Sequence, residues 1–351
     1  MYIGVDTHKQ THVFVAIDAN GRTSGSRTLA NTPEGWATAL RWAREQQQHI
    51  RWGVENSGSL GKGFAQFLLV QGETEVREVV PHRTAQYRRR GRTQDKTDTA
   101  DALAMARLLR AEGELLPLVH VDDVSTELRV LSDYRDNLVV DRTRLINQLH
   151  AQMLQLDPRY AERSGPLTRA AGVRYCLGLP EADGVAQTRL LVVRQLATRL
   201  LQLDADISAV TKALEQQVAA TATPLLQCRG VGAVVAARLL GELGSPPRVH
   251  SAAALAALAG IAPLTVASGG RQGHRVNPGG NRKLNRAIHI IALTQRRCEP
   301  LAQAYYAKKR AEGKTARAAM RCLKRRLVDV LFRLLLPLPA VSPAPLLPIA
   351  A

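Results

Sequence analysis

Four carboxylates stand at positions from which they can share one reaction centre. Asp6 ends the apolar run IGV and Glu55 ends the run WGV, so each closes a predicted strand. Asp98 and Asp101 lie three residues apart, which places them on one face of a helix. Carboxylates gathered in this way repel one another and need cations. We therefore expect the set to bind one or two Mg²⁺ ions, which prefer carboxylate oxygen and support phosphoryl transfer.

Each acid taken alone also has a structural explanation. Asp6 precedes a Thr-His pair and can belong to a turn, and Glu55 can act as a cap. Either helical aspartate can simply favour the positive end of a helix. Asp18 and Asp95 are possible substitutes within the set. The joint pattern, rather than any single acid, carries the prediction.

Ser268 marks a second candidate site. It precedes two glycines and lies near Arg271, His274 and Arg275. Arginines offset the charge of a phosphodiester, and glycines let a phosphate approach the backbone. A serine hydroxyl is a weak nucleophile unless it is activated. From composition alone, a phosphate-binding loop is favoured over a nucleophile at this position.

Positive charge is concentrated in one part of the chain. Between Gly269 and Arg326 there are sixteen lysines and arginines but only two acids, Glu299 and Glu312. Such one-sided charge indicates a polyanionic partner, DNA or RNA, because a solvated surface normally mixes both signs. A second basic run lies between residues 83 and 96, in what we expect to be a loop. The candidate nucleic-acid contacts are Arg88, Arg89, Arg90, Arg92, Lys96, Arg271, Arg275, Arg282, Lys283 and Arg286.

The composition of the 351-residue chain excludes several classes of protein. Its net charge is +18, and 45% of its residues are hydrophobic, which is enough to build cores and excludes wholesale disorder. The four cysteines lie far apart, so neither a zinc ribbon nor a disulfide scaffold is expected. No unbroken apolar run of about 20 residues predicts a membrane span. We expect a cytoplasmic, nucleoid-associated bacterial protein with reduced thiols.

The first third of the chain alternates strand and helix patterns. Three strands come first, and the last two are joined by an Asn20-Gly21 hairpin turn. A helix then begins at the Thr32-Pro33 pair, and strand, helix, strand and helix follow. This order is the topology of the ribonuclease H-like nuclease fold. The α/β region precedes an all-α remainder.

The rest of the chain is predicted to be mostly helical. Leucines recur with heptad spacing near residues 131–149 and 196–214, which predicts two long helices. These helices can form an intramolecular hairpin or pair with another chain as a coiled coil. Farther on, Gly230-Val231-Gly232 suggests a helix-hairpin-helix-like element that binds phosphate through backbone N–H groups, although close helix packing explains the glycines nearly as well. A Gly/Arg-rich loop and a basic helix follow.

These residues together resemble a known family, the insertion-sequence transposases in which a RuvC-like domain with a DEDD tetrad precedes a transposase domain bearing a serine. The resemblance spans roughly residues 2–326. The matching motifs, in family order, are IGVDTHK, VENSG, KTDTADALAMA, RGVG, LAGIAP, SGGRQGH and GNRKLNRA. The family often has a second serine just before the nucleophile, where this chain has Ala267. Residues 337–351 have no counterpart.

The resemblance implies a function for each candidate site. Asp6, Glu55, Asp98 and Asp101 would bind Mg²⁺, and Ser268 would form a covalent phosphoserine link to DNA. The family members are recombinases guided by a structured non-coding RNA, the bridge RNA, which pairs with donor and target DNA. Homodimers would assemble into a tetramer, in which one subunit supplies the tetrad and another supplies the serine.

The predicted organisation follows from these patterns. A RuvC-like domain occupies residues 1–120, a helical coiled-coil linker residues 121–220, a transposase domain residues 221–336, and a Pro/Ala-rich tail residues 337–351. Two other functions stay open at this point. One is a Mg²⁺-dependent junction nuclease that uses only the tetrad and water. The other is a non-catalytic RNA- or DNA-binding remnant of a mobile element.

Overall fold

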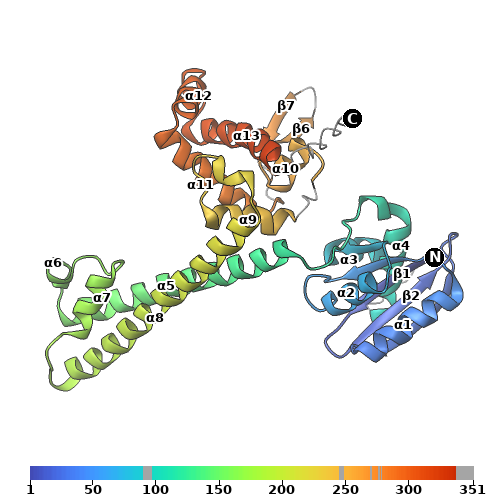
Figure 1. The fold of residues 1–351 in the computed structure, drawn as a ribbon, viewed down its shortest axis with the longest axis horizontal. Helices are drawn as coiled ribbons and strands as arrows, with labels where there is room; N and C mark the ends of the chain where they lie inside the picture. The colour runs from blue at the N-terminus through green and yellow to red at the C-terminus, as the bar shows by residue number, and fades with distance from the viewer. Residues whose placement is uncertain (90–96, 245–248, 269–270, 276, 278, 337–351) are drawn as a thin grey trace, which may run out of the picture. The chain divides into compact units, whose positions relative to one another are not determined.

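The chain folds into two compact units, Met1–Asp122 and Asp123–Ala351. The computed structural model describes residues 1–89, 97–244, 249–268, 271–275, 277 and 279–336. Figure 1 labels the helices and strands of both units. The predicted proline-rich tail, residues 337–351, lies outside the described residues.

The first unit is built on a mixed five-stranded sheet in the order β3-β2-β1-β4-β5. β1 pairs with β2 in antiparallel fashion and with β4 in parallel fashion, and β5 extends the parallel part. This agrees with the ribonuclease H-like arrangement expected from the sequence. The strands are Tyr2–Thr7 (β1), Thr11–Ile17 (β2), Thr23–Ala30 (β3), Arg51–Glu55 (β4) and Val76–Val79 (β5).

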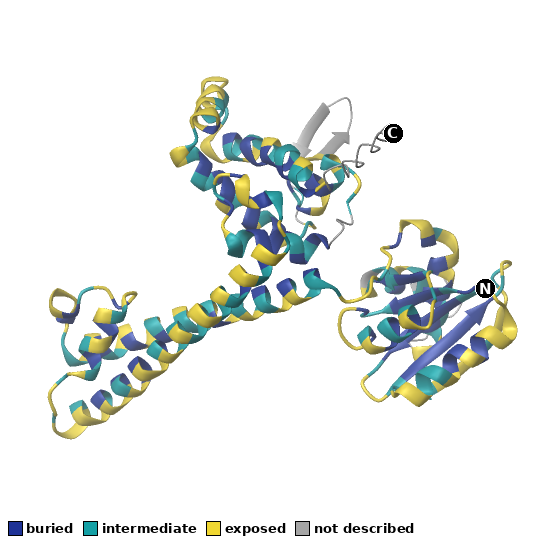
Figure 2. Ribbon diagram, viewed as in Figure 1, coloured by how far each residue is buried: buried dark blue, intermediate teal, exposed yellow. Residues whose placement is uncertain are grey.

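Helices cover the sheet of this unit. As predicted, Thr32 caps the first helix and Pro33 opens it. Phe14 and Trp52 of the sheet meet Phe64 edge to face, with ring centroids 5.2 and 5.6 Å away. Figure 2 shows β1, β2 and β4 and the inner helix faces as mostly buried, whereas the outer strand β3 is mostly exposed. The helices are Pro33–Gln46 (α1), Lys62–Val70 (α2), Pro81–Arg89 (α3) and Asp98–Glu112 (α4), with a 3₁₀ turn at Gly113–Leu115.

Helix α4 approaches the backbone of β1 at Gly4. A Cβ placed on Gly4 would lie 2.0 Å from the carbonyl oxygen of Ala102 and 2.5 Å from the backbone nitrogen of Ala106. Only a residue without a side chain fits between these backbones. Because alternate residues of a strand share a face, this contact also sets the helix above Asp6.

The basic segment after β5 was predicted to be a loop, and this prediction is wrong for residues 81–89. They form α3, which begins at Pro81. Two of its side chains bind Glu112 of α4: Arg83 forms an ion pair with it, and the Tyr87 hydroxyl donates a hydrogen bond of 2.6 Å. These tertiary contacts stabilise a helix that its arginine-rich sequence alone does not predict.

The second unit begins with a long helical hairpin. Helices α5 and α8 pack along each other, and two short helices at their far ends share a core with them. The intramolecular pairing allowed by the leucine spacing is therefore present, while pairing with another chain stays a prediction. These helices are Val124–Leu156 (α5), Tyr160–Ser164 (α6), Ala170–Leu177 (α7) and Gly184–Ala220 (α8).

The other end of the hairpin belongs to the core of the remaining helices. Leu128 of α5 and Leu214 of α8 are buried in the same cluster as residues of the last helices. Arg238 is only 7% exposed and forms ion pairs with Asp133 and Asp136 at the base of the hairpin. It also pairs with Glu242, one turn farther along its own helix. The elements are Pro224–Gln227 (3₁₀), Ala233–Leu243 (α9), Ala252–Leu258 (α10), Leu264–Ser268 (β6), Arg271–Arg275 (β7), Arg282–Cys298 (α11), Pro300–Ala311 (α12) and Ala316–Leu335 (α13).

Two local predictions for this unit need correction. The Gly/Arg-rich loop around Ser268 is an antiparallel hairpin of β6 and β7, in which Ser268 pairs with Arg271. In the predicted helix-hairpin-helix element, only a 3₁₀ turn precedes the glycines. Gly230 has a φ of +89°, and a Cβ there would lie 3.1 Å from Thr294. Backbone conformation and close packing thus account for this glycine.

Within the described residues, no helix is long and apolar enough to cross a membrane.

The contact at Gly4 predicts that Gly4→Ala destabilises the first unit. The added methyl group meets backbone atoms that cannot move without shifting α4, so the free energy of unfolding should fall by about 1–3 kcal/mol or more. Thermal unfolding of the full chain, followed by circular dichroism, measures the loss. Gly58→Ala is the matched control, because no atom lies within 4 Å of a Cβ at that position. Equal melting temperatures for both variants would contradict the predicted contact.

Candidate functional site

Strand β1 positions Asp6 and delivers His8 just beyond its end. Asp6 lies inside the strand rather than in a turn, and it is only 5% exposed. The Nε2 atom of His8 lies 3.3 Å from the Oδ2 atom of Asp6. The structural alternative for Asp6 as a turn residue therefore does not apply.

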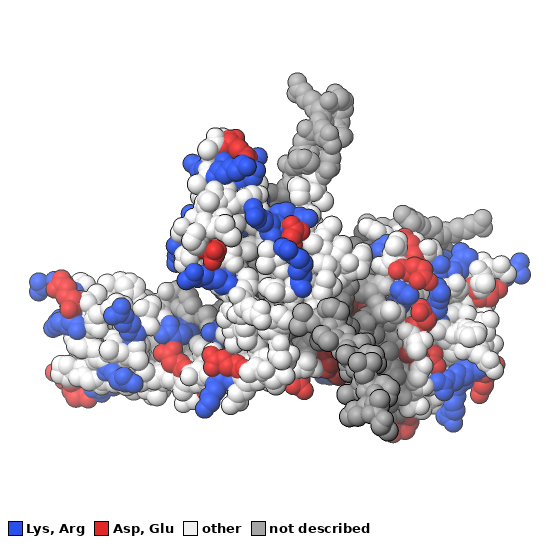
Figure 3. All heavy atoms as spheres, turned by 45° about the horizontal axis from the view of Figure 1, so that its top comes forward, with Lys and Arg blue, Asp and Glu red and all other residues white. Residues whose placement is uncertain are grey.

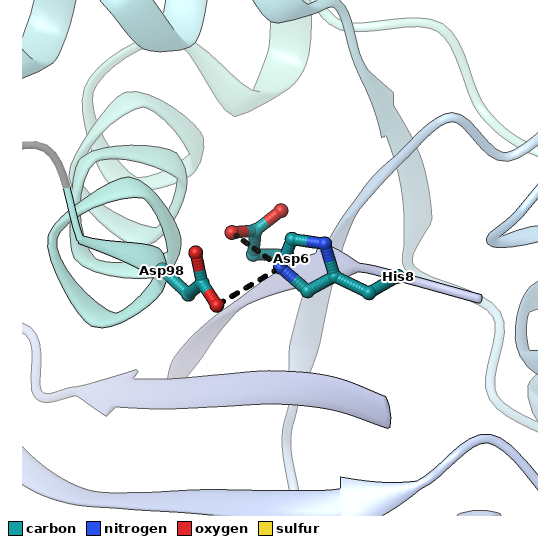
Figure 4. A group of neighbouring side chains, drawn as sticks. All are labelled: Asp6, His8 and Asp98. Atoms are coloured by element: carbon teal, nitrogen blue, oxygen red, sulfur yellow. Dashed lines mark ion pairs between the residues drawn. The ribbon is translucent and has the colours of Figure 1, made fainter. Parts of the chain in front are cut away.

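Helix α4 brings two more carboxylates to the same place. Its first turn is fixed by Thr97, whose hydroxyl accepts a hydrogen bond of 3.1 Å from the backbone N–H of Ala100. Asp98 then reaches His8, with 3.2 Å between its Oδ2 atom and Nε2. Figure 4 shows the imidazole of His8 directed at both aspartates. The positive end of the helix favours carboxylates at this turn.

The carboxylates influence one another strongly. The pKa of Glu55 is raised from 4.5 to about 7. Burial is the largest cause, and the negative charges of Asp6 and Asp101 act in the same direction. Burial also raises the pKa of Asp6, and the charges of Asp98 and Asp101 act in the same direction, while His8 opposes them. The structure thus brings the four predicted acids together at one edge of the sheet, where β1 and β4 run parallel.

The arrangement fits a divalent cation. One ligand atom each from Asp6, His8 and Asp98 lies within 4.8 Å of the others. Among the described residues, Nε2 of His8 has no hydrogen-bond partner, although two carboxylates lie at ion-pair distance. A buried nitrogen without a hydrogen-bond partner, beside two carboxylates, is an arrangement that a bound cation would satisfy. His8 was missing from the predicted ligands, yet its position two residues after Asp6 is the signal that could have found it.

Arg88 lies beside the acidic cluster. It was predicted to contact nucleic acid, and in the structure its guanidinium forms an ion pair with Asp101. A positive charge thereby stands beside the tetrad from α3. The other predicted contacts of this segment, Arg90, Arg92 and Lys96, lie outside the described residues, as does Asp95, and so does the side chain of Arg89.

Asp18 serves a structural purpose at the opposite end of β2. Its Oδ1 atom accepts hydrogen bonds from the backbone N–H groups of Asn20 (2.9 Å) and Arg22 (2.8 Å). These bonds hold the hairpin turn in which Gly21 has a φ of +82°. The turn explains Asp18 without any role in the acidic cluster.

Ser268 is the last residue of β6 in the second unit. The two glycines that follow it lie outside the described residues, as do the side chains of Ser268, Arg271 and Arg275. The strand pairing sets Ser268 opposite Arg271 at the turn end of the hairpin, next to the predicted phosphate-binding glycines. Either of its predicted roles is compatible with this position.

A basic surface covers the last helices of the second unit. Figure 3 shows lysines and arginines gathered over this region, while the long hairpin carries both signs of charge. Of the predicted contacts on α11, Arg282 and Arg286 are exposed. Lys283 is engaged by acids of its own unit, with Nζ 2.7 Å from Asp133 and 3.8 Å from Glu242. Its charge is therefore partly neutralised within the protein.

The raised pKa of Glu55 makes stability depend on pH. Between pH 4.5 and about 7 the folded chain retains a proton that the unfolded chain has released, so stability falls as the pH rises through this window. In metal-free solution, Glu55→Gln should therefore melt above the wild type at pH 8, and the difference should shrink at pH 5. Adding Mg²⁺ should stabilise the wild type more than the variant.

Scanning fluorimetry at both pH values, with and without Mg²⁺, measures these differences. Glu45→Gln, which alters an exposed carboxylate of α1, is the control and should follow the wild type. A pH-independent difference between Glu55→Gln and the wild type would refute the electrostatic explanation.

Comparison with known proteins assigns both units. Residues 3–158 match the model of a transposase family named for a DEDD motif and the element IS110. Residues 222–307 match the model of the transposase IS116/IS110/IS902 family. The first match includes all four acids of the cluster, and the second includes Ser268.

Whole-chain relatives agree with these matches. The 44.8-kDa protein of insertion element IS116 from Streptomyces clavuligerus is 30% identical over 98% of this chain and 97% of its own length. The 42-kDa protein of IS900 from Mycobacterium paratuberculosis is 27% identical over 95% of each chain. The 43.6-kDa protein of IS110 from Streptomyces coelicolor is 31% identical over 68% of this chain and 70% of its own. The chain therefore belongs to the IS110 family of insertion-element transposases.

Proposed function

We propose that this transposase exchanges DNA strands through a covalent phosphoserine intermediate at Ser268, assisted by Mg²⁺ at the acidic cluster. The observation that carries the proposal is the convergence of Asp6, Glu55, Asp98 and Asp101 at one sheet edge, where burial and the neighbouring carboxylates raise the pKa of Asp6 and of Glu55. Such a cluster suits phosphoryl transfer, in which charge develops on oxygen and needs a cation.

The proposed step conserves the phosphodiester energy. The hydroxyl oxygen of Ser268 attacks phosphorus, an Oγ–P bond forms, and the bond from phosphorus to the neighbouring nucleotide breaks. The serine hydroxyl loses its proton as it attacks, and the leaving DNA oxygen takes up a proton to become a free hydroxyl. Later attack by that hydroxyl, or by that of a second strand, reverses the chemistry and frees the serine. Arg271 and Arg275, neighbours of Ser268 in the hairpin, are proposed to offset the phosphate charge.

The acids and His8 are proposed to act as a group. Asp6, Glu55, Asp98 and Asp101 would hold the cation, with His8 as a further ligand or neighbour. A bound Mg²⁺ supplies Lewis acidity, which polarises the phosphate and favours an ionised attacking oxygen. Because Arg88 pairs with Asp101, loading the cation requires this arginine to give up its partner or share it.

Partners and assembly are part of the same proposal. Donor and target DNA are the substrates, and a structured bridge RNA encoded by the element selects them by base pairing. The exposed arginines of α11 supply part of the basic surface that both nucleic acids need. Dimers that join into a tetramer would combine the tetrad of one subunit with Ser268 of another.

Ser268→Ala should abolish the covalent protein–DNA adduct. The wild-type chain, incubated with Mg²⁺, labelled donor and target DNA and RNA from the flank of the element, should give a shifted band on a denaturing gel. The variant lacks the attacking oxygen and should give none, while its binding to DNA stays within about twofold of the wild type. An adduct of unchanged intensity in the variant would rule out Ser268 as the nucleophile.

Asp6→Asn should lower strand cleavage by about a hundredfold or more, because a neutral amide no longer contributes the charge that holds the cation. Asp18→Asn is a matched control, since an asparagine can still accept the turn hydrogen bonds made by Asp18. Cleavage rates on labelled DNA, with binding measured separately, test the pair. Equal rates in the two variants would disprove the role of the tetrad.

A metal-dependent junction nuclease is the second candidate function. It is favoured by one observation: the four acids converge within Met1–Asp122, a compact unit with its own core. Such an enzyme would use water in place of Ser268. Cleavage without an adduct, unchanged by Ser268→Ala, would identify it.

A further inference from the structure

A cavity in the second unit is not used by the proposed chemistry. It has a volume of about 710 Å³, within the range of small-ligand sites. Its walls come from the stretch Gly260–Pro263 and from helices α11, α12 and α13, and Asn277 and Lys314 complete them. Ile261, Pro263 and Ala318 give it an apolar side.

The remaining wall is strongly cationic. Among the lining residues that the structure describes, the only acid is Asp329, which is paired with Arg325 at 2.6 Å. Lys309 likewise has a partner in Glu312, at 2.8 Å. The other cations have no carboxylate at ion-pair distance among the described residues. The lining cations are Lys309, Lys314, Arg321, Lys324, Arg325 and Arg326.

Lys324 is the most unusual of these cations. It is only 8% exposed, and its Nζ atom donates a hydrogen bond of 2.6 Å to the neutral side-chain oxygen of Asn285. Burial and the nearby charge of Arg321 lower its pKa. A buried ammonium without a counter-charge costs free energy unless an anion joins it. The cavity is therefore complementary to an anionic ligand.

An aromatic ring stands in the same wall. The guanidinium of Arg326 lies 4.9 Å from the ring centroid of Tyr305, and Nζ of Lys309 lies 5.5 Å from it. Aromatic and guanidinium planes are the surfaces on which unpaired bases stack. Phosphate-binding cations, an aromatic ring and an apolar side thus occur together.

The cavity also adjoins the hairpin that carries Ser268. Gly260–Pro263 leads directly into β6, and Asn277, another lining residue, follows β7. Both ends of the hairpin therefore contribute to the cavity wall. A ligand held there is held at the base of β6 and β7.

We propose that this cavity binds one unpaired nucleotide of a DNA or RNA strand, with its phosphate against Lys324 and Arg321 and its base against Tyr305 and the apolar side. The proposal deepens the proposed function and rests on it for the identity of the polymer. It does not depend on the serine chemistry. As a consequence, the bound nucleic-acid strand is held at the base of the hairpin that carries Ser268.

Binding of short oligonucleotides to the full-length chain in EDTA tests the proposal without any cleavage. Single-stranded DNA, single-stranded RNA and duplex DNA of one mixed sequence are compared by fluorescence anisotropy. Lys324→Met should weaken single-strand binding by about tenfold, because it removes a charge-assisted contact while keeping the packing volume. Arg321→Gln, at an exposed lining position, should weaken it similarly and carries little risk of misfolding.

Lys308→Met is the matched control, since it removes the same charge from an exposed position of α12 that does not line the cavity. It should change binding by less than about twofold. The DNA and RNA arms show which strand the cavity prefers. Equal losses in Lys308→Met and Lys324→Met, or duplex binding as sensitive as single-strand binding, would overturn the proposal.

Cysteine alkylation gives a second readout in the unmodified protein. Cys322 lines the cavity and Cys298 is exposed at the end of α11, while Cys176 and Cys228 are buried. A bound single strand should slow the alkylation of Cys322 several-fold more than that of Cys298, as measured by mass spectrometry. Uniform protection of both thiols, or none, would show that the cavity stays empty. Neither result would bear on adduct formation at Ser268.

Discussion

The close contact between the backbones of β1 and α4 is the constraint on which the acidic cluster depends. Because Gly4 has no side chain, the helix lies directly on the strand, with no layer of side chains between them. The first turn of α4 then reaches the end of β1, and Asp98 comes within reach of His8. A layer of ordinary side chains at this point would move the helical acids away from Asp6.

That geometry places four carboxylates close together, and the groups around them offset their mutual repulsion only in part. Thr97 caps α4, so the positive end of this helix lies beside the carboxylates. His8 forms an ion pair with Asp6, and Arg88 forms one with Asp101. The pKa of Glu55 is raised first by burial and then by the charges of Asp6 and Asp101, so its ionised form is disfavoured there despite these partners. Stability is therefore lost at this edge of the sheet, and a cation that bound only the folded chain there would restore it.

The sequence predicted those features that depend on local pattern. The two strands that carry Asp6 and Glu55, the spacing of Asp98 and Asp101, the Thr32 cap and the leucine-rich hairpin all follow from periodicity and turn chemistry, although β1 ends at Thr7 rather than at Asp6. Features that depend on distant partners escaped prediction. Helix α3 forms because Glu112 holds it, and Arg88 faces an acid thirteen residues farther along the chain. No window of neighbouring residues contains that information.

The cavity lined by α12 and α13 illustrates the same limit at larger scale. Its cations were recognised as a basic segment, but charge along a chain does not reveal which lysine becomes buried. Lys324 is distinguished from its neighbours only by the packing of α13 against α10 and α11. Similarly, the β6–β7 hairpin was hidden by glycines and arginines that suggest a loop, because strand pairing there is a property of two segments together.

The anchored base of the α5–α8 hairpin has a mechanical consequence. Helix α8 has 37 residues and extends about 55 Å at the usual rise of a helix. Arg238 and the shared core clamp one end of this arm, whereas the end bearing α6 and α7 has a small core of its own. Such an arm amplifies movement at its base. A slight rotation among the helices around Arg238 moves the tip through a much larger arc, so the position of α6 and α7 is sensitive to small changes in the packing at the base.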